Sequence, residues 1–288
     1  MPTLADLGLE SSPHADPLCY PGAIPDRSGL LVDDWFIELR AVEDGPVGSY
    51  TVHPSGGGPV PTASEPLEPL SLDQVLLALG VTRVDDRRPL LAVGSNAAPA
   101  QIRSKFDRFG ITTALPMLRC TVDGWRRTVL AHVSIPGYLP ITIEADPRAR
   151  SLSVSLLLCD DEQLGAIDAT EPNYRRLTAA DSEPLTLDSG ERLCGYLVYV
   201  GRRGSVRAQD GSIIDFTTQE HAIAAVHSLL SDELRAECGP DARSFVAATA
   251  GSAALRDRIR DHLATTAAPE PEEVTTDPPT YADLRRQG

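Results

Sequence analysis

Residues 90–99 read LLAVGSNAAP, the pattern of a buried strand, a tight turn and the start of a helix. The run 90–93 is short and apolar, which is typical of an interior strand. Residues 94–96, Gly-Ser-Asn, supply the turn. Pro99 suits a first helical position because its missing N–H would have no partner there, so a helix is expected to continue over 101–109.

The junction between this strand and this helix is a candidate anion site. It leaves backbone N–H groups without intrahelical partners, with the positive end of the helix dipole behind them. Such a position can hold an anion or a developing oxyanion. Because the same pattern occurs in many α/β proteins, it favours an ordinary connection unless a second feature supports a site.

The composition indicates a globular protein. The chain has 288 residues, of which 42% are hydrophobic, enough for one large domain or two small ones. Its net charge of -15 argues against nucleic acid or an anionic membrane surface as a partner. Lys105 is the only lysine, every other cationic side chain being arginine. This bias fits a GC-rich coding sequence, and no chemistry is assigned to Lys105.

Cysteine usage and the N-terminus both indicate a cytoplasmic protein. The five cysteines are scattered and none forms a C-x-x-C pair, so neither a zinc site nor a disulfide framework is predicted. The first residues lack a cationic start and a long apolar run, so no signal peptide is predicted. No apolar stretch approaches the roughly 20 residues that cross a bilayer. We therefore expect a soluble, cytoplasmic protein with reduced thiols.

Strand-like segments dominate the middle of the chain. They are expected over 113–132 (an extended pair bent near 123–124), 139–144, 152–158, 177–187 and 192–200. A helix is expected from Asp160, with Leu164 and Ile167 facing inward. This order predicts an α+β domain with a curled, mainly antiparallel sheet or barrel, rather than a doubly wound sheet.

The N-terminal half divides into two parts. An N-terminal extension, 1–85, is expected to combine coil, a hairpin between 30–42 and 49–52, and a short helix capped by Ser71. The strand-rich domain follows over 86–205.

The C-terminal part is expected to be helical and then disordered. Within 206–267, a capping box at Thr217-x-x-Glu220 begins one helix and Ser252 begins another. These helices are expected either to cover the barrel or to form a homodimer surface. The tail 268–288 is rich in Pro, Glu and Thr, which predicts disorder.

Glu171 is the candidate acid–base residue. It stands where a helix beginning near Asp160 must stop, since Pro172 disfavours helical geometry at the residue before it. The carboxylate would then lie near the negative end of a helix and close to an apolar face. Both effects raise the pKa of a carboxyl group toward neutrality, as a general acid or base requires. The competing interpretation is a surface glutamate paired with Arg175 or Arg176.

Together, these segments resemble the gamma-glutamyl cyclotransferase-like family. One motif is the buried strand ending in Gly-Ser-Asn at 94–96. The others are LGAIDATE at 164–171, about 75 residues later, and EPNYRR at 171–176. The resemblance covers roughly 88–203, which is well under half of the chain.

The resemblance implies both a fold and a reaction. The fold is a small mixed, mainly antiparallel β-barrel with flanking helices. In the reaction, the α-amine of a γ-glutamyl group attacks its own γ-carbonyl, giving 5-oxoproline and a free amine, and neither metal nor cofactor is required. Glu171 would be the catalytic acid and base. The residues expected to bind the small-molecule γ-glutamyl or related acyl amide substrate are Val93, Gly94, Ser95, Asn96 and Tyr174.

One residue departs from the family's pattern. Family loops usually carry tyrosine before Gly-Ser, where this chain has Val93. The loss of this hydroxyl implies a different substrate or no catalysis, unless another tyrosine supplies it. The candidates for that replacement are Tyr138, Tyr174, Tyr196 and Tyr199.

Two classes of function stay open. The first is a cyclotransferase-like enzyme, and the long additions on both sides of the barrel suggest a specialised biosynthetic intermediate as its substrate. The second is a non-catalytic module on the same fold that binds a small molecule or another protein. Glu171 favours the enzyme, because a negative charge would weaken a mere binding site for an anionic ligand. Val93 favours the module.

Overall fold

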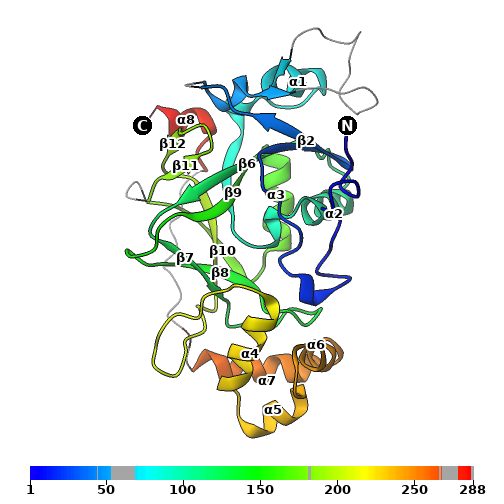
Figure 1. The fold of residues 1–288 in the computed structure, drawn as a ribbon, viewed down its shortest axis with the longest axis vertical. Helices are drawn as coiled ribbons and strands as arrows, with labels where there is room; N and C mark the ends of the chain where they lie inside the picture. The colour runs from blue at the N-terminus through cyan, green and yellow to red at the C-terminus, as the bar shows by residue number, and fades with distance from the viewer. Residues whose placement is uncertain (44, 53–68, 181–182, 266, 268–277, 287–288) are drawn as a thin grey trace.

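A computed structural model describes residues 1–43, 45–52, 69–180, 183–265, 267 and 278–286 (Figure 1). Its strands are β1 (Gly29–Val32), β2 (Trp35–Arg40), β3 (Thr51–Val52), β4 (Leu70–Ser71), β5 (Arg88–Ala92), β6 (Leu115–Val122), β7 (Trp125–Val129), β8 (Ile141–Ala145), β9 (Leu152–Cys159), β10 (Tyr174–Thr178), β11 (Leu185–Leu187), β12 (Arg192–Leu193) and β13 (Leu197–Gly201). Its helices are α1 (Leu72–Ala78), α2 (Pro99–Phe109), α3 (Asp161–Thr170), α4 (Gln219–Leu229), α5 (Asp232–Cys238), α6 (Ala242–Gly251), α7 (Ala253–Ala264) and α8 (Tyr281–Arg285). None of the described helices has the length and apolar character needed to cross a membrane.

The strands form a large, mostly antiparallel sheet, as expected for an α+β protein. Its order is β10-β13-β5-β9-β6-β1-β2-β3-β4, with β11 joining both β6 and β12. Among the described ladders of this sheet, β13 and β5 alone run parallel, which excludes a doubly wound arrangement. β7 and β8 pair as a separate two-stranded ribbon. In the part of the chain that the structure describes, the pairing follows an open path from β10 to β4.

β5 lies inside the sheet and is buried on both faces. Leu90 and Ala92 belong to the hydrophobic cluster that includes residues of α2 and α3, whereas Leu91 and Val93 belong to a second cluster. A strand enclosed on both sides does not alternate with polar residues, which explains the uninterrupted apolar run at 90–93. In Figure 1, α2 and α3 lie side by side next to the sheet.

The strand, turn and helix predicted from the opening segment all form. β5 ends at Ala92, a 3₁₀ turn covers Ser95–Ala97, and α2 begins at Pro99. Gly110 follows α2 with a φ of 67°, the left-handed conformation that glycine adopts without steric cost.

The helix predicted from Asp160 is α3. The Asp160 side chain accepts a hydrogen bond from the Gln163 N–H, and the Gln163 side chain accepts one from the Asp160 N–H, which completes a capping box. Leu164 and Ile167 are buried, as predicted. The helix ends at Thr170, so Glu171 lies directly beyond it.

Some boundaries differ from the sequence expectations. The strand expected over 30–42 breaks at Asp33, whose φ of 49° makes a tight turn between β1 and β2. β1 then pairs with β6, so the N-terminal extension joins the main sheet. The two strands expected within 177–200 are divided into four short ones, β10 to β13. α4 is capped by Thr218 rather than Thr217, because the Thr218 hydroxyl accepts the capping hydrogen bond.

Helices α4 to α7 gather at one end of the molecule (Figure 1) and support the segment before β8. The buried Gln219 side chain accepts from the Leu139 N–H and donates to the Leu139 carbonyl, both at 2.9 Å. Gly137 lies against α6, where an added Cβ would approach the Val246 carbonyl oxygen at 2.7 Å. These contacts fix the segment 134–140 in place.

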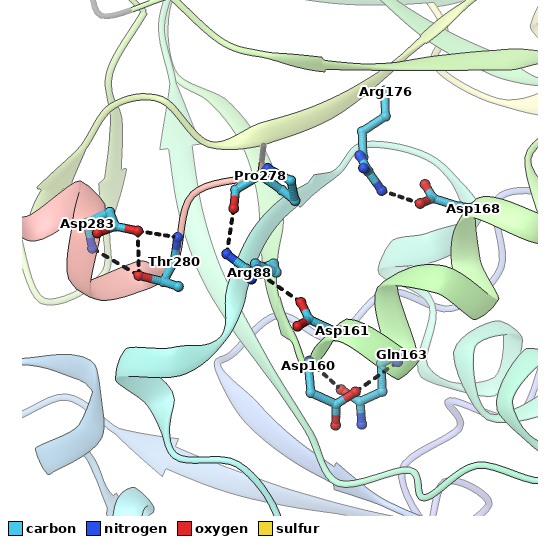
Figure 2. Close-up of polar contacts among 9 residues, drawn as sticks. All are labelled: Arg88, Asp160, Asp161, Gln163, Asp168, Arg176, Pro278, Thr280 and Asp283. Carbon is cyan, nitrogen blue, oxygen red and sulfur yellow. Dashed lines mark hydrogen bonds and ion pairs between the residues drawn. The ribbon is translucent and has the colours of Figure 1, made fainter. Parts of the chain in front are cut away.

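The end of the chain differs from the disordered tail expected over 268–288. The structure describes 278–286 of this tail, and these residues dock on the sheet domain and include α8. Arg88 of β5 donates to the Pro278 carbonyl and also pairs with Asp161 at the start of α3 (Figure 2).

Tyr281 anchors α8. It is fully buried, its hydroxyl donates to Glu191 Oε2 at 2.7 Å, and the same hydroxyl accepts from the Val47 N–H at 3.2 Å. Its own N–H donates to the Arg87 carbonyl at 2.7 Å. Composition could not reveal this docking, because one buried, hydrogen-bonded tyrosine outweighs the polar character of its neighbours.

We expect Tyr281→Phe to lower the free energy of unfolding by roughly 1–3 kcal/mol, because it leaves the Val47 N–H without a buried partner. Denaturant unfolding measures the change. The control is Arg285→Gln, which removes a half-exposed ion pair with Glu191 and should cost less than about 1 kcal/mol. Equal losses in the two variants would contradict the anchoring role of Tyr281.

Candidate functional site

The centre of the candidate site is a cluster of three side chains, Asn96, Lys105 and Glu171. Lys105 Nζ donates to Glu171 Oε1 and to Asn96 Oδ1, each at 2.6 Å. Asn96 Nδ2 also donates to Glu171 Oε1, at 3.1 Å. The side chains of Lys105 and Glu171 are only 15% and 14% exposed. Such a pair is hard to separate, because a buried carboxylate that loses its cation is costly.

The packing of α2 against α3 brings these residues together from different parts of the sequence. Asn96 lies in the 3₁₀ turn before α2, Lys105 lies within α2, and Glu171 follows α3. Ile102 of α2 and Ile167 of α3 belong to one buried cluster, so the two helices pack against each other. This packing places the turn before α2 beside the end of α3.

The Glu171 carboxylate has one oxygen that accepts hydrogen bonds and one that is open. Both donors reach Oε1, and Oε2 accepts no hydrogen bond from a described residue. The interpretation that Glu171 pairs with Arg176 at the surface is wrong, because Arg176 bonds to Asp168 instead (Figure 2). Oε2 is therefore the atom that Glu171 can offer to a ligand.

Two buried tyrosine hydroxyls meet the backbone of Ile141 beside this cluster. Tyr20 accepts from the Ile141 N–H at 2.9 Å, and Tyr174 donates to the Ile141 carbonyl at 2.7 Å. The Tyr20 ring stacks on Tyr138, with ring centroids 4.3 Å apart. Burial is the main cause that raises the pKa of Tyr20 and Tyr174 well above the usual range and the pKa of Tyr138 to about 12. All three hydroxyls are therefore protonated at neutral pH.

A small cavity of about 30 Å³ lies between the turn and Glu171, with room for roughly two water-sized groups. Its lining includes the six residues that the sequence placed in the site, Val93, Gly94, Ser95, Asn96, Glu171 and Tyr174. The cavity adjoins a larger cleft of about 410 Å³, and both are lined by Tyr20, Ser95, Glu171 and Tyr174. A ligand in the cleft can thus place one small group against the turn.

The turn residues Ser95 and Asn96, which line the small cavity, have backbone N–H groups without partners among the described residues. Ser95 and Asn96 are the first residues of a 3₁₀ helix, so their N–H groups have no intrahelical acceptor. Neither N–H donates to the backbone or a side chain of another described residue. Donors held in this way can stabilise a carbonyl oxygen that gains negative charge.

The larger cleft carries an excess of positive charge. α2 contributes Lys105 and Arg108, and among the described residues Glu171 is the one acidic side chain in the lining. Lys105 balances Glu171, so the Arg108 charge has no acidic counterpart there. In a chain with a net charge of -15, a cleft of this sign favours an anionic ligand.

His132 also lines the cleft. Its Nε2 lies 3.3 Å from Asn173 Nδ2. Burial is the largest cause that lowers the pKa of His132 to about 4, and the nearby guanidinium of Arg203 lowers it further. The imidazole is therefore neutral at neutral pH and can accept a hydrogen bond from the Asn173 amide.

The four tyrosines proposed to replace the hydroxyl missing at Val93 do not lie together. Tyr174 and Tyr199 line the small cavity, and Tyr138 lines the cleft. Tyr196 lies elsewhere, with its hydroxyl bonded to the Glu183 carbonyl.

Two site residues were not predicted from the sequence. Codon usage explains Lys105 from the sequence alone, although its being the single lysine among 26 Lys and Arg residues is a signal. Tyr20 belongs to an N-terminal segment expected to be coil, and nothing in its local sequence marks it. Its hydroxyl lies beside Gly94, where an added Cβ would approach the oxygen at 2.9 Å.

The sequence matches no family model and no curated protein. Three solved structures are similar to part of the chain. The solution structures of At3g28950.1 and At5g39720.1 from Arabidopsis thaliana have TM-scores of 0.30 and 0.31 and identities of 17% and 19%, and each alignment covers 40% of this chain. The alignments span 61% and 69% of those proteins. The uncharacterized protein loc79017 from Homo sapiens has a TM-score of 0.32 and 10% identity, over 67% of this chain and 94% of that one. Likeness at this level assigns neither a fold family nor a function.

We expect Gly94→Ala to lower the free energy of unfolding by roughly 1–3 kcal/mol, because the added methyl group displaces the buried Tyr20 hydroxyl. In a Tyr20→Phe background, which lacks that oxygen, the same substitution should cost less. Denaturant unfolding of the two single variants and the double variant measures the coupling. Strictly additive losses would contradict the close approach. Gly165→Ala is the control, since its Cβ would meet open space and should stabilise α3 by about 0.5–1 kcal/mol.

The lowered pKa of His132, about 4 against an ordinary 6.5, predicts a pH-dependent contribution to stability. Between these values the unfolded chain binds a proton that the folded chain does not. Stability should therefore fall as the pH drops from 6.5 to 4, by up to roughly 3 kcal/mol from this group. The difference between wild type and His132→Gln in denaturant unfolding isolates the effect. As a control, replacing the exposed His221 by Gln should leave the change of unfolding free energy with pH the same as in the wild type. An unchanged pH dependence in His132→Gln would contradict the prediction.

Proposed function

We propose that this protein cleaves a γ-glutamyl amide, or a related acyl amide, by internal aminolysis, as its resemblance to the gamma-glutamyl cyclotransferase-like family implies. The observation that carries the proposal is that Glu171 lines the same small cavity as Ser95 and Asn96, whose N–H groups donate to no described residue. An acid–base group and an oxyanion site within one cavity are the two parts that this reaction needs.

The proposed reaction forms one C–N bond and breaks another. The α-amine nitrogen of the γ-glutamyl group attacks the γ-carbonyl carbon, and Glu171 Oε2 takes a proton from that nitrogen. The carbonyl oxygen becomes negatively charged and receives hydrogen bonds from the N–H groups of Ser95 and Asn96. When the carbonyl re-forms, the original amide bond breaks and Glu171 returns the proton to the departing nitrogen. The products are 5-oxoproline and a free amine, and no water is consumed.

The shape of the site would supply much of the rate acceleration. The nucleophile and the electrophile belong to one molecule, so a site that folds the substrate into a near-attack conformation removes a large entropic cost. Tyr20 and Tyr174 hold Ile141 from two sides and so fix one wall of the small cavity. In this proposal the Tyr20 hydroxyl also takes the place of the tyrosine that the family carries at the position of Val93.

We also propose that the strand-rich domain is a barrel and that the protein is cytoplasmic. Residues 86–205 would form a small cyclotransferase-like barrel in which the β7–β8 ribbon completes one side. Contacts of β8 with β13 and of β7 with β9 support this arrangement. All five cysteines are free thiols, which supports a reducing cytoplasm. Tyr20 of 1–85 lines the cleft, and Gln219 of 206–267 holds the backbone next to the lining residue Tyr138. These contributions support a specialised substrate, such as a biosynthetic intermediate.

The second candidate function is a module that binds a small molecule without cleaving it. Lys105 favours this candidate because it already occupies Oε1 of Glu171. Val93 favours it as well, because it places an apolar group against the small cavity. Such a module would leave its ligand intact.

We expect the wild type to release 5-oxoproline from at least one member of a panel of γ-glutamyl amines, and Glu171→Gln to reduce kcat by roughly 10²- to 10⁴-fold. Mass spectrometry of 5-oxoproline measures the release. Glu162→Gln, which changes an exposed carboxylate at the start of α3, is the matched control and should keep full activity.

Two other outcomes would overturn the proposal. Equal activity of wild type and Glu171→Gln would remove Glu171 from the chemistry. If no amide is cleaved while an intact γ-glutamyl amine raises the melting temperature, the protein is a binding module.

A further inference from the structure

The Lys105–Glu171 pair is complementary to the head group of an α-amino acid. Such a group carries an amine and a carboxylate on one carbon, and the site presents a carboxylate and an ammonium 2.6 Å apart. We propose, building on the proposed function, that Lys105 binds the α-carboxylate of the substrate while Glu171 receives the α-amine. Lys105 is then the residue that determines specificity for a γ-glutamyl group over an acyl group without the carboxylate.

The hydrogen bonds of Lys105 leave one donor for this role. An ammonium group has three N–H donors. Two of them reach Glu171 Oε1 and Asn96 Oδ1, and no other described residue accepts from Lys105 Nζ. The side chain lines the 410 Å³ cleft, so the third donor is available to a ligand there. A carboxylate is the acceptor that forms the strongest hydrogen bond with it.

Glu171 leaves a matching acceptor on the same side of the pair. Its Oε1 takes both protein donors, which leaves Oε2 for the amine of the ligand. The two open positions, an N–H of Lys105 and Oε2 of Glu171, belong to side chains in direct contact. A ligand with both charges on one carbon can engage them together, and a ligand lacking either charge cannot.

The choice of lysine supports a role beyond charge balance. All the other 25 cationic side chains of the sequence are arginine. A compact ammonium can serve three acceptors around one atom, whereas a planar guanidinium presents its donors as a fork in one plane. The three acceptors proposed here surround a single Nζ atom, which suits lysine and not arginine.

The test compares two ligands that differ only in the α-carboxylate, γ-L-glutamyl methylamide and 4-aminobutanoyl methylamide. Release of methylamine gives kcat/KM for each. We expect the wild type to prefer the carboxylate-bearing ligand, and Lys105→Met to reduce the ratio of the two kcat/KM values by about 10- to 100-fold. The ratio does not depend on the fraction of variant protein that folds. Lys105→Arg should retain part of the preference, because it keeps the charge.

Arg103→Gln is the matched control, since it removes one positive charge from the same helix at a side chain that pairs with Asp34. It should leave the ratio unchanged. If Lys105→Met slows both substrates equally, Lys105 only positions Glu171 and the inference is wrong.

The inference can still be tested if the protein has no cyclotransferase activity. If the wild type cleaves neither methylamide, isothermal titration calorimetry with the same two ligands decides the inference alone. A preference for the carboxylate ligand that Lys105→Met abolishes would support it without any catalysis. Absence of binding, or equal binding of the two ligands by the wild type, would overturn it.

Discussion

The candidate site depends on the salt bridge between Lys105 and Glu171. A carboxylate that is mostly buried needs a cation and hydrogen-bond donors close to it, and Lys105 and Asn96 supply both. The same ammonium bonds to Asn96, so it ties the turn before α2 to the end of α3. The direction of Glu171 Oε2 and the place of the backbone donors at Ser95 therefore follow from one charged contact.

Both flanks of the strand-rich domain take part in shaping the cleft. Tyr20, from the N-terminal extension, places its ring on Tyr138 and its hydroxyl on the backbone of Ile141. From the C-terminal side, Gln219 holds the backbone of Leu139, and α6 lies against Gly137. Tyr20 thus lines the cleft itself, whereas Gln219 and α6 hold the backbone beside the lining residues Tyr138 and Pro136.

Features with local physical causes were predictable from the sequence. The apolar run of β5, the proline that begins α2 and the start of α3 at Asp160 depend on residues a few positions apart, and these elements formed where expected. Contacts between distant segments were not predictable. Lys105 meets Glu171 only because α2 packs on α3, and Tyr20 reaches the cavity only because its segment folds across the sheet domain. The hydrogen-bond partners of Tyr281 are likewise distant in the sequence, so composition predicted disorder for a segment that is ordered around Tyr281.

The hydrogen bonds between Gln219 and Leu139 join residues 80 positions apart, and they have a consequence for the order of folding. During synthesis the strands β5 to β9 emerge well before α4, so the cleft initially lacks the contact that fixes one of its walls. Contacts of such long sequence separation close slowly, because a large loop must be ordered first. Strands β5, β6 and β9 can therefore pair while α4 is still being made, and the backbone of Leu139 gains its contact with Gln219 only afterwards.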